Sequence, residues 1–170
     1  MKRRLFVFYF LLCLMEGTYS QTVTVNNLPS DLKGVRMNFQ MDFSNAIIFG
    51  LKEKEFAEYE KDWYDDKSTV IRNFKSGANL AIGKSYGIGD YKNAQLTIRV
   101  NVETITNEGF IICNTDIVNS ENEVLFHIDH LTAGKEPAIS LGTKLARVKV
   151  WATLTGKKLG SILKSELSNK

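Results

Sequence analysis

The sequence predicts an α+β fold, a two-layer α/β sandwich in which helices cover one face of a mainly antiparallel, four-stranded sheet. Residues 35–43 alternate between apolar and polar side chains, which is typical of a strand with one buried face and one wet face. Residues 96–128 hold three more such runs joined by short turns, and strands joined in this way are antiparallel neighbours. Segments with apolar residues at helical spacing stand between and after these strands, so helices are expected on the apolar face of the sheet.

A separate segment is expected to precede the α+β domain. Val23 and Val25 alternate with threonines, which suggests a short strand or an extended arm. Pro29 breaks the pattern because proline favours turns. We expect residues 21–34 to form an extended N-terminal arm and residues 35–170 to form a single α+β domain.

Two helices are expected between the first and second long strands. Three aromatic residues spaced three and four positions apart predict a short amphipathic helix: Phe56, Tyr59 and Trp63. Asp65 and Asp66 are expected to end it. A second helix is expected to begin at Asp66 or Ser68, because either side chain can cap a helix N-terminus.

The last strands and the closing helix follow from the same patterns. The inward faces of the third and fourth long strands are expected to be Ile111, Cys113, Thr115 and Ile117, then Val124, Phe126 and Ile128. Residues 138–167 predict one long helix. Within it, Gly156 and Gly160 predict close packing of the helix on the sheet.

Residues 1–20 have the layout of a secretory signal peptide. Basic residues at positions 2–4 precede eleven apolar residues at positions 5–15. A bilayer span needs about 20 residues, so an uncleaved membrane anchor is the weaker alternative. Cys13 follows Leu12 rather than a small residue, so no lipoprotein is expected. The chain is therefore expected to be exported to the periplasm, the outer envelope or the extracellular space.

Charge and cysteine content narrow the classes of partner. Outside the leader, 19 basic and 18 acidic residues remain, so no nucleic-acid partner is expected. Cys113 is the one cysteine left, and its apolar neighbours predict a buried thiol with no intrachain disulfide.

Two sequence motifs resemble active sites. Residues 83–87 match the G-x-S-x-G pattern of hydrolases, and Asp116 and then His127 or His130 follow Ser85 in the order of a triad. However, a helix precedes Ser85 and a strand follows it, which is the reverse of the context that exposes a nucleophile. Ser85 and His127 are therefore only weak catalytic candidates.

The second motif, at residues 125–130, resembles the H-x-H-x-D-H zinc motif of metallo-β-lactamase-like hydrolases. Leu125 replaces the first histidine, and the chain has no third histidine. On a strand, His127 and Asp129 would face one way and His130 the other, so the three would not converge without a bend. No metal or cofactor is expected.

Two surfaces are candidates for binding. The open face of the sheet is expected to present Arg36, Arg99, Glu103, Asp116, His127 and Asp129. The C-terminal helix carries a basic group formed by Lys144, Arg147, Lys157, Lys158 and Lys164. Residues 135–170 have a net charge of +6 and residues 21–134 a net charge of −5, so the basic helix could rest on an anionic membrane surface.

The leader, the Met-Asp-Phe-Ser-Asn-Ala segment at 41–46 and the Gly-Lys-Lys-Leu-Gly segment at 156–160 resemble those of small uncharacterised exported envelope proteins of Gram-negative bacteria. The resemblance covers most of the chain after the leader. It implies a β-α-β-β-β-α domain and an envelope address, and it implies no functional residues.

We therefore expect an exported, non-enzymatic domain that binds a protein or an envelope component. One alternative is a small hydrolase that uses Ser85 or the His127, Asp129 and His130 group. The other alternative is peripheral attachment to a membrane through the basic helix.

Overall fold

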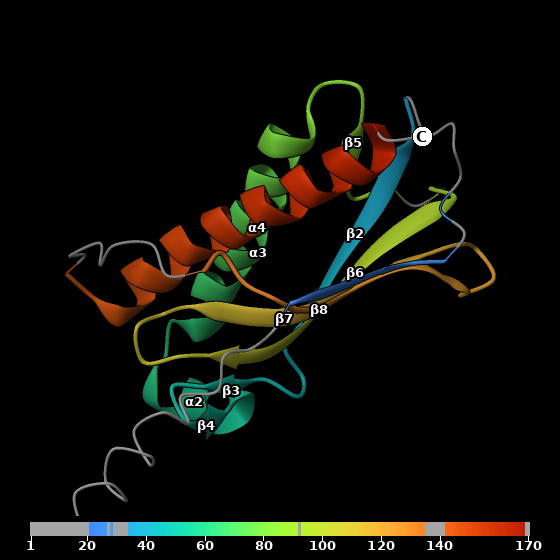
Figure 1. The fold of residues 1–170 in the computed structure, drawn as a ribbon. Helices are drawn as coiled ribbons and strands as arrows, with labels where there is room; N and C mark the ends of the chain where they lie inside the picture. Colours follow the sequence, from blue (N-terminus) through green and yellow to red (C-terminus); the bar gives the residue numbers. More distant parts are fainter. Residues whose placement is uncertain (1–20, 27, 29–33, 92, 135–141, 169–170) are drawn as a thin grey trace, which may run out of the picture.

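The computed structural model describes residues 21–26, 28, 34–91, 93–134 and 142–168 (Figure 1). The expected leader lies outside the described residues. The strands are β1 (Thr22–Val25), β2 (Arg36–Asp42), β3 (Ile47–Ile48), β4 (Leu51–Lys52), β5 (Gly87–Gly89), β6 (Leu96–Ile105), β7 (Ile111–Val118) and β8 (Val124–Leu131). The helices are α2 (Glu53–Tyr59), α3 (Trp63–Ile82) and α4 (Lys144–Ser168). Among them, none is long and apolar enough to cross a membrane.

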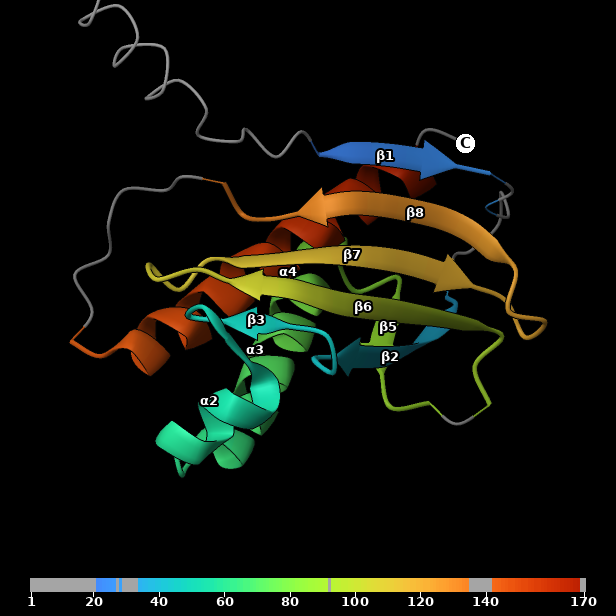
Figure 2. The same ribbon diagram turned by 90° about the horizontal axis from the view of Figure 1, so that it is seen from below.

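The α+β class is confirmed, but the predicted sheet is wrong. The described residues form one sheet of eight strands in the order β1-β8-β7-β6-β2-β5, with β3 paired to β6 and β4 paired to β3. Helices α3 and α4 lie together on one face of this sheet (Figure 1). Seen from below, the strands lie in front of α3 and α4, so neither of these helices covers this face, which we call the open face (Figure 2).

The sheet is mixed because β2 pairs in parallel with both β5 and β6. The chain from β2 to β6 passes through α2 and α3, and parallel neighbours need a crossover of this length. The short connections from β6 to β7 and from β7 to β8 give the antiparallel pairs that the sequence predicted. Within residues 21–34, β1 joins the sheet antiparallel to β8.

Helix α3 begins at Trp63, earlier than predicted. Asp65 and Asp66 do not end a helix but lie in the first turn of α3, where the positive end of the helix dipole favours carboxylates. The Trp63 ring is fully buried and packs edge-on against Phe43 and Phe56, with centroid distances of 5.9 and 5.1 Å. Burial of this large ring places the start of α3 in the core.

Helix α4 confirms the predicted C-terminal helix from Lys144 onward, and residues 138–141 lie outside the described residues. Its two glycines face α3, not the sheet as predicted. A Cβ atom on Gly156 would lie 2.0 Å from the carbonyl oxygen of Phe74, and one on Gly160 would lie 2.3 Å from that of Ala78. The glycine spacing therefore lets two helix backbones come into contact.

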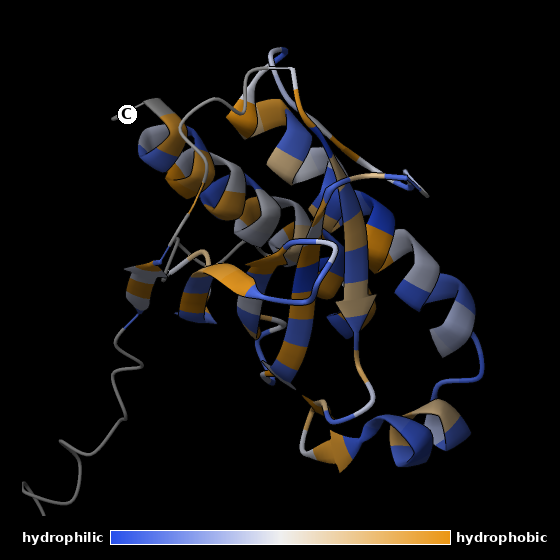
Figure 3. Cartoon of the chain, turned by 90° about the vertical axis from the view of Figure 1, so that its right-hand side faces the viewer, coloured by the Kyte–Doolittle hydropathy of each residue, from blue (hydrophilic) through white to orange (hydrophobic). Residues whose placement is uncertain are grey.

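The alternation of hydropathy along the strands separates the core from the open face (Figure 3). Cys113 is buried, as predicted, and its Sγ lies 3.6 Å from the carbonyl oxygen of Leu131. The predicted inward faces of β7 and β8 are confirmed except at Val124, which is 41% exposed. A register shift between Ile117 and Val118 displaces Val124 and leaves Leu125 buried instead.

Candidate functional site

The most organised polar group on the open face spans β6, β7 and β8. Cross-strand pairing places Arg99 beside Asp116 and Asp116 beside His127. Nδ1 of His127 lies 2.6 Å from Oδ1 of Asp116. With Nδ1 donating its proton to this carboxylate, the second ring nitrogen of His127 is the acceptor that a ligand could use.

A β-bulge in β8 brings His130 to the same face, contrary to the prediction that it points away. Thr115 pairs with Ile128, and Cys113 pairs with Leu131, so Asp129 and His130 together lie opposite a single residue of β7. His130 has a φ of 49°. A bulge of this kind reverses the alternation of side chains, so Asp129 and His130 share one face with His127.

Glu103 and Asn114 hold His130 in this position. Nδ1 of His130 lies 2.8 Å from Oε2 of Glu103, and the backbone N–H of His130 donates to Oδ1 of Asn114 at 2.9 Å. Nδ2 of Asn114 in turn donates to Oε1 of Glu103 at 2.9 Å. The hydrogen bond that His130 donates to Glu103 raises the pKa of His130, and desolvation opposes that shift only in part. We call Glu103, Asn114, Asp116, His127 and His130 the histidine cluster.

The histidine cluster contains two histidine–carboxylate pairs, but these do not form a metal site. Within the described parts of the chain, no three histidine, cysteine or acidic side chains converge on a point that could hold an ion. Asp129 adds a further carboxylate, with Oδ2 3.8 Å from Nε2 of His130. The cluster therefore offers hydrogen-bond donors and acceptors on a fixed scaffold.

Ser85 is not brought to these histidines. It lies between α3 and β5, and the strands β2, β6 and β7 separate β5 from β8. Four strand spacings amount to roughly 19 Å, which is far beyond a hydrogen bond. The G-x-S-x-G segment is the turn from α3 into an edge strand.

The other predicted binding residues lie in three places. Arg99 contacts the side chain of Asn122, while Arg36 lies on β2, away from the histidine cluster. On α4, Lys144 lies over the ring of Phe49 and Arg147 donates to the carbonyl oxygen of Asn107. The rest of the predicted basic group is exposed on the same helix: Lys157, Lys158 and Lys164.

The two edges of the sheet differ in whether their outward-pointing backbone N–H and C=O groups have hydrogen-bond partners. At β5, the Asn79 side chain from α3 covers the edge: its Nδ2 donates to the Ile88 carbonyl at 2.6 Å, and its Oδ1 accepts from the Ile88 N–H at 2.9 Å. The side-chain amide of Asn79 makes the two hydrogen bonds that a neighbouring strand would make to Ile88. It therefore blocks the addition of a further strand to β5.

The outer edge of β1 has no such cover among the described residues. The backbone N–H of Asn26 bonds to Leu125, so the alternation of an antiparallel ladder turns the backbones of Thr22 and Thr24 toward β8. The N–H and C=O groups of Val23 and Val25 therefore point outward. All four residues of β1 are exposed.

Comparison with known proteins identifies no family: no family model matches the chain, and no curated protein matches it. Among solved structures, a dodecameric PelC variant from Paraburkholderia phytofirmans is similar at 14% identity over 85% of this chain and 98% of that chain, with a TM-score of 0.44. Protein XCC0632 from Xanthomonas campestris, assigned to DUF330, is similar at 10% identity over 89% of this chain and 97% of that chain, with a TM-score of 0.35.

Both similar proteins come from Gram-negative bacteria, the group to which the sequence resemblance points. The identities and TM-scores are too low to carry an argument about this chain. The sequence did not predict His130 on the open face, because no local signal marks the bulge. It also did not predict that Tyr91 lies on this face.

Proposed function

We propose that this chain is an exported, non-enzymatic domain that binds a partner protein by adding an extended segment of that partner to the outer edge of β1. The observation that carries this proposal is the contrast between the two sheet edges: Asn79 covers one, and none of the described residues covers the other. Unpaired strand edges are templates for another strand, and proteins usually protect them with charges, prolines or cover.

The residues of β1 provide none of this protection. Thr22–Val25 contains no charged residue and no proline. Val23 and Val25 are 38% and 36% exposed, and they pair with Ile128 and Phe126 on the helix-covered face. Apolar side chains of an added strand would cover these valines and remove their surface from water.

The opposite face of β1 sets a different requirement for the partner. Thr22 pairs with Asp129 and Thr24 pairs with His127 on the open face, so an added strand would lie beside these two threonines and one strand away from β8. Its side chains on that face would be polar, because they would lie beside the hydroxyl groups of these threonines and face water. The partner segment is therefore expected to alternate between apolar and polar residues.

Proline at position 23 or 25 tests the proposal, because these two N–H groups point away from β8. Val23→Pro together with Val25→Pro removes two outward donors but leaves the β1–β8 bonds in place. A partner purified from envelope extracts with the wild-type chain should bind this variant at least tenfold more weakly, since each hydrogen bond contributes about 1 kcal/mol and the apolar contact is lost as well.

Val23→Ala serves as the matched control, since it shortens the side chain and keeps the N–H. Hydrogen exchange on the purified complex should show new protection at Val23 and Val25. Undiminished binding by the double proline variant would refute strand addition. Protection of both amides in the chain alone, with a dimer in sedimentation, would show that the occupant is a second copy and not another protein.

Membrane attachment remains a second candidate because Lys157, Lys158 and Lys164 are exposed on one helix. It predicts binding to anionic vesicles that weakens with salt. Lys157→Glu with Lys158→Glu should abolish that binding, whereas equal binding to neutral vesicles would exclude this mode.

A further inference from the structure

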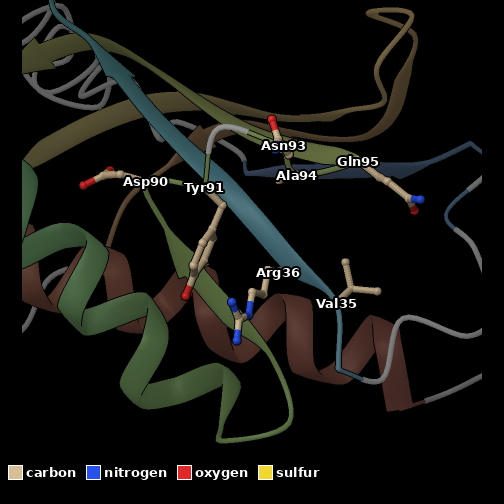
Figure 4. A pocket seen from close by; sticks show the side chains of 7 residues that line it. All are labelled: Val35, Arg36, Asp90, Tyr91, Asn93, Ala94 and Gln95. Atoms are coloured by element: carbon tan, nitrogen blue, oxygen red, sulfur yellow. The ribbon is translucent and has the colours of Figure 1, made fainter.

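A pocket of about 580 Å³ lies on the sheet beside the start of β2, apart from the histidine cluster (Figure 4). Small-molecule sites are commonly about 300–1,000 Å³ in volume. Its lining comes from β2 and from the connection between β5 and β6: Val35, Arg36, Asp90, Tyr91, Asn93, Ala94 and Gln95.

The ring of Tyr91 forms the most ordered part of this pocket. It packs against β5 at two glycines: a Cβ atom on Gly89 would lie 3.0 Å from Cε2 of Tyr91, and one on Gly87 would lie 3.2 Å from its hydroxyl oxygen. Glycine at both positions therefore lets the ring lie flat on the strand. Arg36 pairs with Gly87 across the sheet and lies on the face opposite the buried Met37, so the ring is on the open face.

The guanidinium of Arg36 lies over this ring, with Cζ 5.4 Å from the ring centroid (Figure 4). A stacked guanidinium keeps the N–H groups at its edge free for a ligand. Among the residues that the structure describes, no carboxylate forms an ion pair with Arg36. Asp90 also lines the pocket, but its carboxylate is held by Lys75 at 2.8 Å.

We propose that this pocket binds a small organic ligand through a carboxylate group. The planar guanidinium of Arg36 matches a carboxylate with two parallel hydrogen bonds. Asn93 and Gln95 supply amide groups for a second polar part of the ligand, and Val35 and Ala94 supply apolar surface for its carbon skeleton. A phosphate dianion fits less well, because Arg36 is the one cationic residue in the described lining and supplies a single positive charge.

The test uses the full chain and N-acetyl-alanine, which carries one carboxylate, one amide and one methyl group. The ligand is titrated while backbone NMR signals are followed. We expect saturable shifts at Arg36, Tyr91 and Gln95. The neutral amide of the same compound should bind at least tenfold more weakly, because a hydrogen bond between charged groups contributes about 1.5–3 kcal/mol.

Single-residue variants distinguish specific binding at Arg36 from a general attraction of anions to basic side chains. Arg36→Gln should lower the affinity for N-acetyl-alanine at least tenfold. Arg36→Lys should lower it to an intermediate degree, because lysine lacks the planar guanidinium that donates two parallel hydrogen bonds. Arg99→Gln is the matched control on the same face and should leave the affinity unchanged. The double proline variant of β1 should also leave it unchanged, because the pocket does not depend on strand addition.

Three results would overturn the proposal. The first is the absence of saturable shifts in the pocket with N-acetyl-alanine. The second is equal affinity for the acid and its neutral amide. The third is binding of inorganic phosphate as tight as that of the carboxylate, which would remove the assigned ligand class.

Discussion

Replacement of Gly156 by alanine should destabilise the fold through the contact between α3 and α4. The added Cβ would lie 2.0 Å from the carbonyl oxygen and 2.9 Å from the carbonyl carbon of Phe74. Real Cβ contacts are essentially never shorter than 3.0 Å, so the two backbones must separate by at least 1.0 Å (3.0 minus 2.0). Backbone atoms cannot rotate away as a side chain can.

Two opposing effects determine how much Gly156→Ala lowers the free energy of unfolding. Overpacking a tight interior costs about 1–3 kcal/mol, and the upper end applies because backbone meets backbone. Alanine gains about 1 kcal/mol over glycine in helix propensity. The net loss in free energy of unfolding is therefore about 2 kcal/mol, or roughly 4–8 °C in Tm for a chain of this size.

Urea denaturation followed by circular dichroism measures this loss. Gly142→Ala is the matched control, because a Cβ atom on Gly142 would meet nothing within 4 Å and its change should stay within about 0.5 kcal/mol. If Gly156→Ala were as stable as the wild type, the close approach of the two helices would be refuted.

Three further predictions concern single side chains. Burial raises the pKa of Cys113 to about 12, so the thiol should not react with a disulfide reagent at mildly alkaline pH until denaturant is added; rapid reaction of the folded chain would contradict this. Glu103→Gln should lower the pKa of His130 toward its ordinary value in an NMR titration. Because Glu103 raises that pKa, its contribution to stability is present in full below about pH 6.5 and is lost as the pH rises through the folded-state pKa. Asn79→Ala should cost about 1–3 kcal/mol and speed hydrogen exchange at Ile88, whose polar groups would lose their partner, and an unchanged exchange rate would argue against the edge cover.

Local patterns in the sequence determined most of the elements of this protein. Alternation of period two located β2, β6, β7 and β8, and it placed Cys113 in the core. Short turns then gave the antiparallel order of β6, β7 and β8. These features depend on residues close together in the chain, so they can be read without the fold.

The tertiary structure alone decided how these elements combine. The parallel pairing of β2 with β6, the pairing of β1 with β8 and the stacking of Arg36 on Tyr91 each join segments far apart in the sequence. The bulge that turns His130 toward Glu103 depends on the register between β7 and β8. Register and strand order are set by which distant surfaces bury one another, and no local period in the chain encodes that choice.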